Sequence, residues 1–464
     1  MKNLCGCVIA FLVAFGLFLG GYFLLKTDKE EKPLVFFIPE NAELDITIDG
    51  MPVYYQRGNI YPQTMNTLAD VTIRVNHMEK NISVRKISKS DFIPIEIFSG
   101  GKSSQYKIQT LPQKFPKISL EKEHNMKKGY ILTSFHGLLL QDPSYAVIFN
   151  TDGQILWYRG NEDIAMSAFH LQRHQEKGKR RYSMHVQTDK ASQSYIRGKH
   201  LLMDETFRIM DEISVLGSPR HPAMPADEHE FVYIDDGHYI VLGYQEKIAK
   251  VQGYDRPVRY VSVLIQEQKD GQVIFEWFSD DWPELFKACY MRCIGSKDPD
   301  YIHMNSVFID PKDNHLIVSL ANGYTVLKIH RQTGEILWRL GGKLDEFSLT
   351  DNQRFYRQHD AYISDDGWLT LFDNQYLVSD ARVLRLKIDE QHKKVMDMQS
   401  YSLSAPAPYM GSAQRMPDGG WFIGCGNSKA CAARYIDKNA KTLFTLHVEK
   451  PYFSYRSYFA ETLD

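Results

Sequence analysis

The sequence predicts an all-β protein whose main part is a six-bladed β-propeller. Two kinds of hairpin recur after residue 118, and together they supply the turns and strands of a four-stranded blade. A small β-sandwich is predicted before the propeller, and an N-terminal transmembrane helix before that. The predicted parts are residues 1–32 for the helix and its tether, 33–117 for the sandwich and 118–464 for the propeller.

The first predicted element is a membrane-spanning helix at residues 4–25, a stretch without any charged residue. About 20 apolar residues span a bilayer as a helix. A cleaved signal peptide is the alternative, since Gly20 and Gly21 are small, but its apolar stretch is usually only about 7 to 15 residues long. We therefore expect an uncleaved anchor.

Short strands of alternating character predict the β-sandwich. They lie at 44–48, 70–75, 82–87 and 94–98, with glycine turns between them. Pro112 and Pro116 then interrupt the pattern, and proline cannot join an interior ladder. We place the boundary with the propeller there.

The outer hairpin of each predicted blade has a polar turn, a glycine or its substitute, an aliphatic pair and, in the clear copies, a tryptophan. The clear copies lie at 150–157, 269–277 and 331–338, and weaker copies lie at 204–209, 389–395 and 437–443. Intervals of roughly 50 to 65 residues match the length of a four-stranded blade with its loops. Six copies predict six blades.

The inner hairpin of three blades begins with a histidine. The hairpins are 229–242, 303–318 and 359–371, and a fourth, 412–423, begins with Ser412. Asp-Gly and Asp-Asn turns explain the hairpin geometry, because these residues accept positive φ. Folding does not explain the histidines, because a strand start favours β-branched or aromatic residues.

Equivalent positions of propeller blades point at one axis, so His229, His303 and His359 are expected to meet in one pocket. His170 is a weaker fourth candidate. Buried imidazoles are costly to desolvate and repel one another when charged, which favours a functional role. Two roles are open at this point: acid, base or nucleophile in a reaction, or three ligands of a zinc ion with an open fourth position.

Charge and cysteine content add two expectations. Lys and Arg number 55 against 57 Asp and Glu, so the net charge of −2 gives no reason to expect a nucleic-acid partner. Cys289 and Cys293 are four residues apart, and Cys425 and Cys431 are six apart. Each pair can close a short disulfide in an oxidising compartment, with unpaired core thiols as the alternative.

Four ordered motifs, at residues 303–307, 333–343, 355–361 and 371–374, closely resemble the arylsulfotransferase family. The resemblance extends more loosely from 106–112 to 410–415. It implies a six-bladed propeller that moves a sulfuryl group from an aryl sulfate donor to a phenolic acceptor through a sulfated histidine, with no metal and no nucleotide cofactor such as PAPS. Bacterial members often carry an N-terminal β-domain and work in the periplasm. We accordingly expect a protein of the bacterial inner membrane with its globular part in the periplasm.

The resemblance also implies roles for single residues. His359, in Arg-Gln-His-Asp-Ala, matches the nucleophile, and His303 and Asn305 match a His-x-Asn pair. His229, in Asp-Glu-His-Glu-Phe, matches an upstream histidine. His229 and Asn305 are expected to donate hydrogen bonds to the sulfuryl group, while His303 is expected to protonate the departing phenolate.

One position departs from the family pattern. Where Ser-Ser-Arg is expected after the His-x-Asn strand, the chain reads Ser319-Leu320-Ala321. Arg382 and Ser412 are further candidates for substrate binding at the channel. Loss of an arginine clamp weakens sulfuryl binding, so a non-catalytic, membrane-tethered propeller that binds a ligand or a protein partner is the alternative function. A quinoprotein dehydrogenase is disfavoured, because the chain shows no calcium ligands or quinone-stacking residues.

Overall fold

The protein is described by a computed structural model that covers residues 115–463 apart from short gaps at 125, 138–142, 154, 166–167, 189–194, 206, 252, 291–293 and 296–298. Before residue 115 it describes only the backbone of the strands. The chain divides into two compact units, residues 1–110 and 111–464. Among the described residues, no helix is long and apolar enough to cross a membrane. The membrane-spanning helix predicted at 4–25 lies outside them and stays a prediction.

The N-terminal unit contains two sheets, with the strand orders β1-β8-β9-β5-β4 and β3-β2-β6-β7. The strands are β1 (Leu34–Ile38), β2 (Leu44–Ile48), β3 (Met51–Pro52), β4 (Tyr55–Gln56), β5 (Asn59–Ile60), β6 (Leu68–Val75), β7 (Met78–Arg85), β8 (Phe92–Ser99) and β9 (Lys102–Gln109). Strands β1 and β5 pair in parallel with β8 and β9, and the other pairs are antiparallel. The side chains of both sheets lie outside the described residues, so the β-sandwich stays a prediction.

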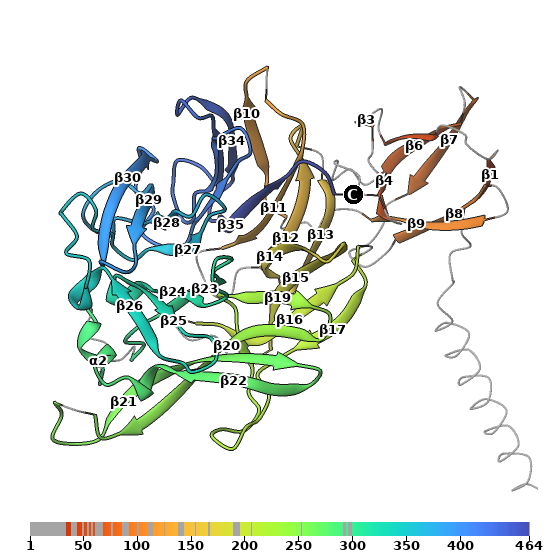
Figure 1. Ribbon diagram of the computed structural model, residues 1–464. Coiled ribbons are helices and arrows are strands. Elements are labelled where there is room, and N and C mark those ends of the chain that lie inside the picture. Colours follow the sequence, from red (N-terminus) through yellow and green to blue (C-terminus); the bar gives the residue numbers. More distant parts are fainter. Residues whose placement is uncertain are drawn as a thin grey trace, which may run out of the picture. The chain divides into compact units, whose positions relative to one another are not determined.

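The second unit is a six-bladed β-propeller, as predicted (Figure 1). From the inner to the outer strand, blade 1 has β35 (Phe453–Ala460), β11 (Tyr130–His136), β12 (Pro143–Asn150) and β13 (Ile155–Ala165), and blade 2 has β14 (Phe169–Glu176), β15 (Lys179–Gln187), β16 (Arg197–Met203) and β17 (Ile209–Ile213), with the short β18 (Ala226–Asp227) beside β16. Blade 3 has β19 (Phe231–Asp235), β20 (His238–Ala249), β21 (Val258–Lys269) and β22 (Gln272–Phe278), and blade 4 has β23 (Met304–Ile309), β24 (Leu316–Leu320), β25 (Thr325–Ile329) and β26 (Ile336–Leu340). Blade 5 has β27 (His359–Ile363), β28 (Leu369–Asp373), β29 (Arg382–Asp389) and β30 (Lys394–Ser402), and blade 6 has β31 (Ser412–Arg415), β32 (Trp421–Gly424), β33 (Ala433–Ile436) and β34 (Thr442–Val448).

Both ends of the propeller segment close its ring. The last strand, β35, pairs with β11 as the inner strand of blade 1, while β10 (Ile118–Lys122) pairs with β34 as a fifth, outer strand of blade 6. In Figure 1 the dark-blue β35 therefore lies beside the gold β11. Because β35 is an inner strand, the end of the propeller sequence reaches the central axis.

Hydrophobic residues of neighbouring blades form the core of the propeller. One cluster joins blades 3 and 4, a second joins blades 4 and 5, and a third joins blades 5 and 6. The predicted tryptophans Trp157, Trp277 and Trp338 are buried at 5%, 2% and 2% exposure. The predicted turn glycines also adopt positive φ, for example 79° at Gly334. Trp277 and Trp338 belong to the clusters that join neighbouring blades, which explains why a tryptophan recurs shortly after the turn.

Short helical segments lie in the loops between strands. They are η1 (Ser279–Asp281), α2 (Leu285–Ala288), η2 (Ala321–Gly323) and η3 (Gly342–Leu344). Cys425 and Cys431 form a disulfide with their Cα atoms 5.9 Å apart, as predicted. The other predicted pair includes Cys293, which lies outside the described residues.

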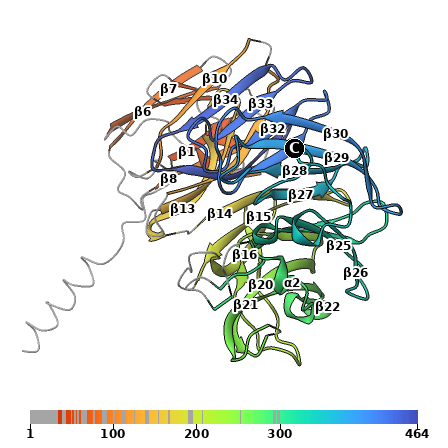
Figure 2. The same ribbon diagram turned by 90° about the vertical axis from the view of Figure 1, so that its left-hand side faces the viewer.

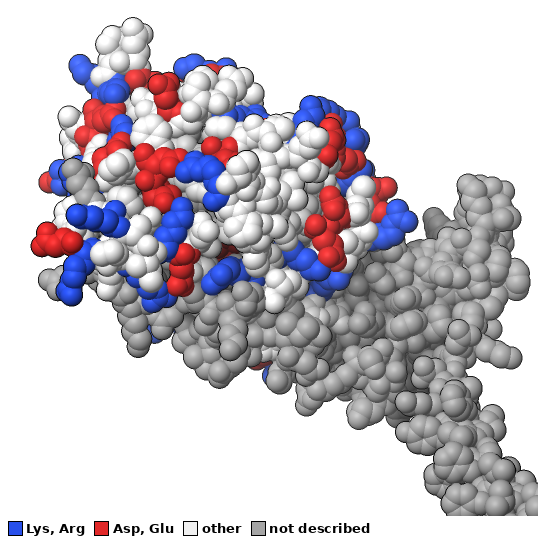
Figure 3. All heavy atoms as spheres, turned by 90° about the horizontal axis from the view of Figure 1, so that it is seen from below, with Lys and Arg blue, Asp and Glu red and all other residues white. Residues whose placement is uncertain are grey.

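Figure 2 shows the propeller from the side, with blades 5 and 6 above blades 3 and 4. In Figure 3, basic and acidic side chains are interspersed over the described part of the face shown. This mixture agrees with the near-zero net charge of the whole chain.

Candidate active site

The histidines singled out by the sequence lie where inner strands begin. His170 is the second residue of β14, His229 lies two residues before β19, His303 comes directly before β23, and His359 is the first residue of β27. All four are buried, with exposures of 2%, 5%, 7% and 3%. The rings of His229 and His303 are 4.7 Å apart between centroids and nearly perpendicular. The rings of His229 and His303 therefore meet as predicted.

Two of these histidines are each backed by a buried aspartate. The Nδ1–H of His229 donates to Oδ1 of Asp227 over 2.7 Å, and the Nδ1–H of His303 donates to Oδ2 of Asp300 over 2.7 Å. In each pair the backbone N–H of the histidine also donates to the same aspartate, over 3.0 and 2.9 Å. The aspartates fix the orientation of each ring and leave its Nε2 atom for other partners.

Burial and charge act in opposite directions on these groups. Burial lowers the pKa of His303, and Asp300 only partly offsets this effect. Burial also works to raise the pKa of Asp227, but the charge and hydrogen bond of His229 outweigh it, so that this pKa is lowered. Asp227 is therefore ionised and can accept the histidine hydrogen.

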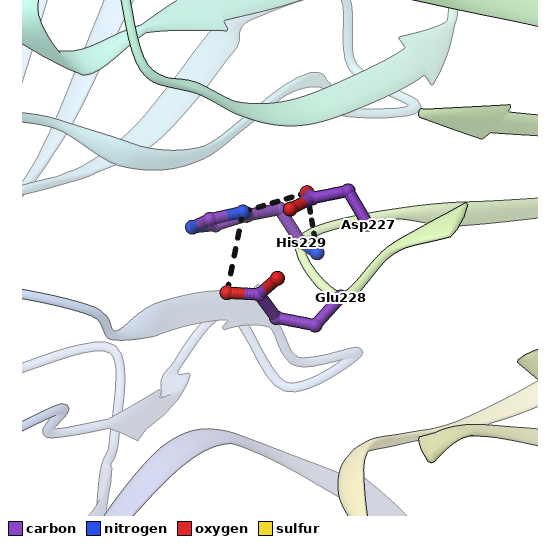
Figure 4. Close-up of side chains that lie close together, drawn as sticks. All are labelled: Asp227, Glu228 and His229. Carbon is purple, nitrogen blue, oxygen red and sulfur yellow. Dashed lines mark hydrogen bonds and ion pairs between the residues drawn. The ribbon is translucent and has the colours of Figure 1, made fainter. Parts of the chain in front are cut away.

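Glu228 lies on the other side of His229 (Figure 4), with Oε1 at 3.6 Å from Nδ1. Burial and the adjacent Asp227 charge raise the pKa of Glu228 well above its usual range, which keeps it protonated. Its Oε2 accepts the backbone N–H of Ile196 over 2.6 Å. Asp227, Glu228 and His229 offer ligand atoms within 4.8 Å of one another, a spacing that can hold a metal ion. The same atoms are joined by the hydrogen bond between His229 and Asp227, which accounts for their closeness without an ion.

His359 is backed by an amide rather than a carboxylate. Its Nδ1–H donates to Oδ1 of Asn374 over 2.8 Å and faces the carbonyl of Arg357 at 3.0 Å. The amide orientation of Asn374 is fixed, because Nδ2 donates to the carbonyls of Ala407 and Met410 over 2.6 and 2.8 Å. The backbone N–H of Met410 lies 3.3 Å from Nε2 of His359. Nδ1 therefore carries the hydrogen, and Nε2 carries the lone pair.

The pKa of His359 is lowered well below its usual value. Burial is the main cause, the hydrogen bond to Asn374 only partly offsets it, and the nearby His303 and Arg456 lower it further. The ring is therefore neutral over the physiological pH range. A neutral imidazole with an oriented Nε2 lone pair is a nucleophile.

Asn305 and Arg456 form the base of the histidine site. Asn305 is fully buried, and its Nδ2 donates to the carbonyl of Gln358, next to His359, over 2.8 Å. Arg456, on β35, is 2% exposed and donates to the carbonyl of Asn305 over 2.5 Å and to Glu230 over 2.9 Å. These bonds connect blades 1, 3, 4 and 5 at the axis. Two carboxyl groups, those of Glu230 and Asp360, lie within 3.3 Å of the guanidinium.

A cavity of about 1070 Å³ is lined by Arg456 and by residues of the inner strands. Its walls include Phe231, Tyr362 and Tyr458, but not His229, His303 or His359. Arg456 lines this cavity and also donates to the carbonyl of Asn305 at the histidine site.

A family model for arylsulfotransferases (ASST) matches residues 117–456, which is most of the chain. The chain belongs to the arylsulfotransferase family. No curated protein matches it. A solved structure of a protein of unknown function from Bacteroides caccae is 10% identical, with a TM-score of 0.45, over 72% of this chain and 100% of that one. The periplasmic gluconolactonase PpgL from Pseudomonas aeruginosa is 11% identical, with a TM-score of 0.38, over 72% and 99%. These likenesses support no functional argument.

The position where the arylsulfotransferase pattern expects arginine lies beside the site. Ala321 is fully buried, and its backbone N–H donates to the carbonyl of His303 over 2.9 Å. Only a methyl group is present here. The departure seen in the sequence therefore lies next to His303 in this family member.

The two further substrate-binding candidates make their hydrogen bonds with the protein. Arg382 donates to Asp373 over 2.8 Å and to the carbonyl of Arg354 over 2.7 Å, which ties two loops together. Ser412 exchanges hydrogen bonds with the backbone of Ser457 over 3.0 and 3.1 Å, which joins blades 6 and 1. Both contacts stabilise the propeller in this arylsulfotransferase family member.

The sequence patterns alone predict no role for the residues that hydrogen-bond to the histidines. Asp227 and Asp300 lie two and three residues before their histidines, and Asn374 ends one of the family motifs. An aspartate two or three residues before a histidine at a strand start is the sequence signal that predicts both Asp–His pairs. No local signal pointed to Arg456, which comes from the last strand of the ring.

Proposed function

We propose that this arylsulfotransferase-family protein transfers a sulfuryl group from an aryl sulfate ester to a phenol through a sulfated His359. The observation that carries the proposal is a difference in the hydrogen-bond partner of Nδ1. This partner is an aspartate for His229 and His303, and the amide of Asn374 for His359. An aspartate stabilises an imidazolium, which suits an acid or a charged donor. An amide orients a ring that stays neutral, which suits a nucleophile.

In the first half of the reaction, Nε2 of His359 attacks the sulfur of the donor. An N–S bond forms, the bond between sulfur and the aryl oxygen breaks, and its electron pair goes to the phenolate. His303, in its protonated form, delivers the Nε2 proton to that oxygen. The sulfated ring retains its Nδ1 hydrogen, which Asn374 accepts. A phenol of pKa near 10 is a poor leaving group without this proton.

In the second half, His303 accepts the proton of the acceptor phenol. The phenol oxygen forms a bond with sulfur, the N–S bond breaks, and its electron pair returns to Nε2 of His359. Both histidines then have their starting protonation. His229 and the second N–H of the Asn305 amide are proposed to donate to the sulfuryl oxygens while their charge grows.

The decisive experiment follows sulfated protein and product together. Wild type is mixed with a chromogenic phenyl sulfate, with and without added phenol, and the intact protein is weighed by mass spectrometry. We expect the mass to increase by one sulfuryl group with donor alone and to return to its initial value when phenol is added. His359→Ala should show neither the sulfated species nor turnover.

The matched control is His392→Ala. His392 is exposed on the outer strand connection of blade 5 and pairs with Asp389 over 2.8 Å, which imitates an Asp–His pair far from the axis. This variant should behave as wild type. Sulfation of the protein in His359→Ala at the wild-type rate would contradict the assignment of the nucleophile.

A non-catalytic propeller that binds a ligand or partner is the second candidate, and Ala321 beside His303 is the observation that favours it. Wild type that binds aryl sulfates but transfers no sulfuryl group across a donor panel would support this candidate.

We also propose that the propeller works in the periplasm of a bacterium, tethered to the inner membrane by residues 4–25. The Cys425–Cys431 disulfide supports an oxidising compartment. Labelling of intact cells with a membrane-impermeant reagent tests this proposal, since a cytoplasmic propeller would stay unlabelled.

A further inference from the structure

Arg357 is a buried cation beside the nucleophile to which the mechanism above gives no role. It lies two residues before His359 and is 9% exposed. Its backbone adopts a positive φ of 54°, which a non-glycine residue adopts only at a cost. Its carbonyl oxygen lies 3.0 Å from Nδ1 of His359. The strained backbone thus belongs to the same short segment that orients the nucleophile.

Two tyrosines from separate loops hold the Arg357 guanidinium. Its central carbon lies 5.2 Å from the ring centre of Tyr376 and 5.0 Å from that of Tyr409. Tyr376 comes from the loop between β28 and β29, and Tyr409 from the loop between β30 and β31. The backbone N–H of Tyr409 is held by Asn427 over 2.9 Å. Cations over aromatic faces are attracted by the ring quadrupole, so the guanidinium is fixed in position.

The loop that carries Tyr409 also reaches the proposed nucleophile. Tyr409 precedes Met410, whose N–H lies 3.3 Å from Nε2 of His359. On the other side, the positive charge of Arg357 adds to the burial that lowers the pKa of His303. The Arg357 guanidinium thus packs against the neighbour of Met410, and its charge acts on His303, whereas Ala321 beside His303 offers only a methyl group.

We propose that Arg357 binds the sulfate group of the donor and that Tyr376 and Tyr409 provide the aromatic wall against which the aryl ring packs. The planar guanidinium can present two parallel N–H donors to the oxygens of a sulfate ester, and an aryl ring packs favourably on tyrosine. The proposal rests on the proposed function, because it names the donor site of that reaction. It makes Arg357 a specificity-determining residue for aryl esters that carry a negative charge.

The competing explanation is that Arg357 only joins two loops. The experiment therefore measures binding of two unreactive ligands by isothermal titration calorimetry. One is p-toluenesulfonate, an aryl sulfonate whose sulfur cannot be transferred, and the other is p-cresol, its uncharged counterpart. Wild type is compared with Arg357→Gln, Arg357→Lys and the matched control Arg220→Gln. Arg220 stacks over Phe278 at 3.7 Å and pairs with Asp281, so the control removes an arginine–aromatic contact away from the site.

Arg357→Gln should weaken sulfonate binding by roughly 10- to 100-fold and leave cresol binding unchanged, since only the charge-assisted hydrogen bonds are lost. Arg357→Lys keeps the charge but not the paired donors, so we expect a loss of about 3- to 10-fold. If Arg357→Gln does not fold, the lysine variant decides. Sulfonate binding unchanged in the variants, or sulfonate and cresol weakened in equal proportion, would overturn the proposal.

Failure of the proposed function is distinguishable from failure of this site. If the wild type binds the sulfonate through Arg357 but transfers no sulfuryl group, the proposed donor site stands and the proposed reaction is wrong. If the wild type transfers sulfuryl groups and Arg357→Gln binds the sulfonate normally, the proposed reaction stands and the proposed donor site is wrong.

Discussion

Replacing Asp300, which hydrogen-bonds to His303, tests whether the Asp300–His303 and Asp227–His229 pairs have different roles in the reaction. In Asp300→Asn the carboxylate that accepts the Nδ1–H of His303 over 2.7 Å becomes a neutral amide of the same shape. Asp300 is 1% exposed, so no water compensates for the lost charge. The imidazolium form of His303 loses its counter-charge and therefore its ability to hold a transferable proton.

A hydrogen bond to a charged group contributes about 1.5–3 kcal/mol. If His303 is the acid, this energy is lost from the transition state, which corresponds to a decrease of about 10- to 150-fold in kcat/KM. The loss should depend on the leaving group. Phenyl sulfate, with a basic phenolate, should show the full decrease, while a nitrophenyl sulfate should lose less than about threefold because its phenolate leaves without a proton.

The assay is kcat/KM for a series of ring-substituted aryl sulfates with wild type, Asp300→Asn and Asp227→Asn. Asp227 backs His229 with the same 2.7 Å geometry, so it is the matched control. We expect Asp227→Asn to lower the rate equally for all donors, because the proposed mechanism gives His229 a contact with the sulfuryl oxygens and none with the aryl oxygen. An equal loss across the series in Asp300→Asn, or a leaving-group dependence in Asp227→Asn instead, would refute the assignment of roles.

Three further predictions concern stability. Removing the disulfide with Cys425→Ala should lower the free energy of unfolding by about 2 kcal/mol, measured by denaturant titration, because the closed loop is short. His185 is fully buried with a pKa lowered to about 4, mainly by burial, so the unfolded chain gains a proton below about pH 6.5 while the fold does not. Stability is therefore lost as pH falls from 6.5 towards 4, by roughly 2 kcal/mol at pH 5, and thermal unfolding of His185→Gln should show a smaller pH dependence. Arg456→Met leaves two carboxylates buried without their cation and should cost about 3–5 kcal/mol, measured by calorimetry; an unchanged melting temperature would contradict the ion network.

The number of blades and the positions of the histidines at the strand starts could be predicted, because both depend on local sequence that repeats. Glycine and asparagine at the turns, such as Gly334 and Asn314, adopt the positive φ that their chemistry allows. A histidine at the same place in successive hairpins must face the same axis once the hairpins become blades. The structure confirms six blades and brings the rings of His229 and His303 together.

The partners of those histidines could not be predicted in the same way. Whether Asn374 or an aspartate faces His359 depends on how the loop after β28 folds back, which no repeat determines. The distinction between a neutral ring and a charged ring is therefore a property of tertiary structure. Ser412 and Arg382 show the opposite case, since their sequence context resembles a site while their hydrogen bonds are made with the propeller itself.

Ring closure has a consequence for synthesis. Arg456 and Tyr455 lie on the strand that is made last among the blades, and they bond to the carbonyls of Asn305 and His229 over 2.5 and 3.4 Å. While the ribosome is still translating blade 6, the histidines of blades 3, 4 and 5 exist but lack the residues beneath them. A nascent chain without β35 therefore has most of its blades but lacks these two hydrogen bonds, and under the proposed function we expect sulfuryl transfer to begin only when this single strand has docked.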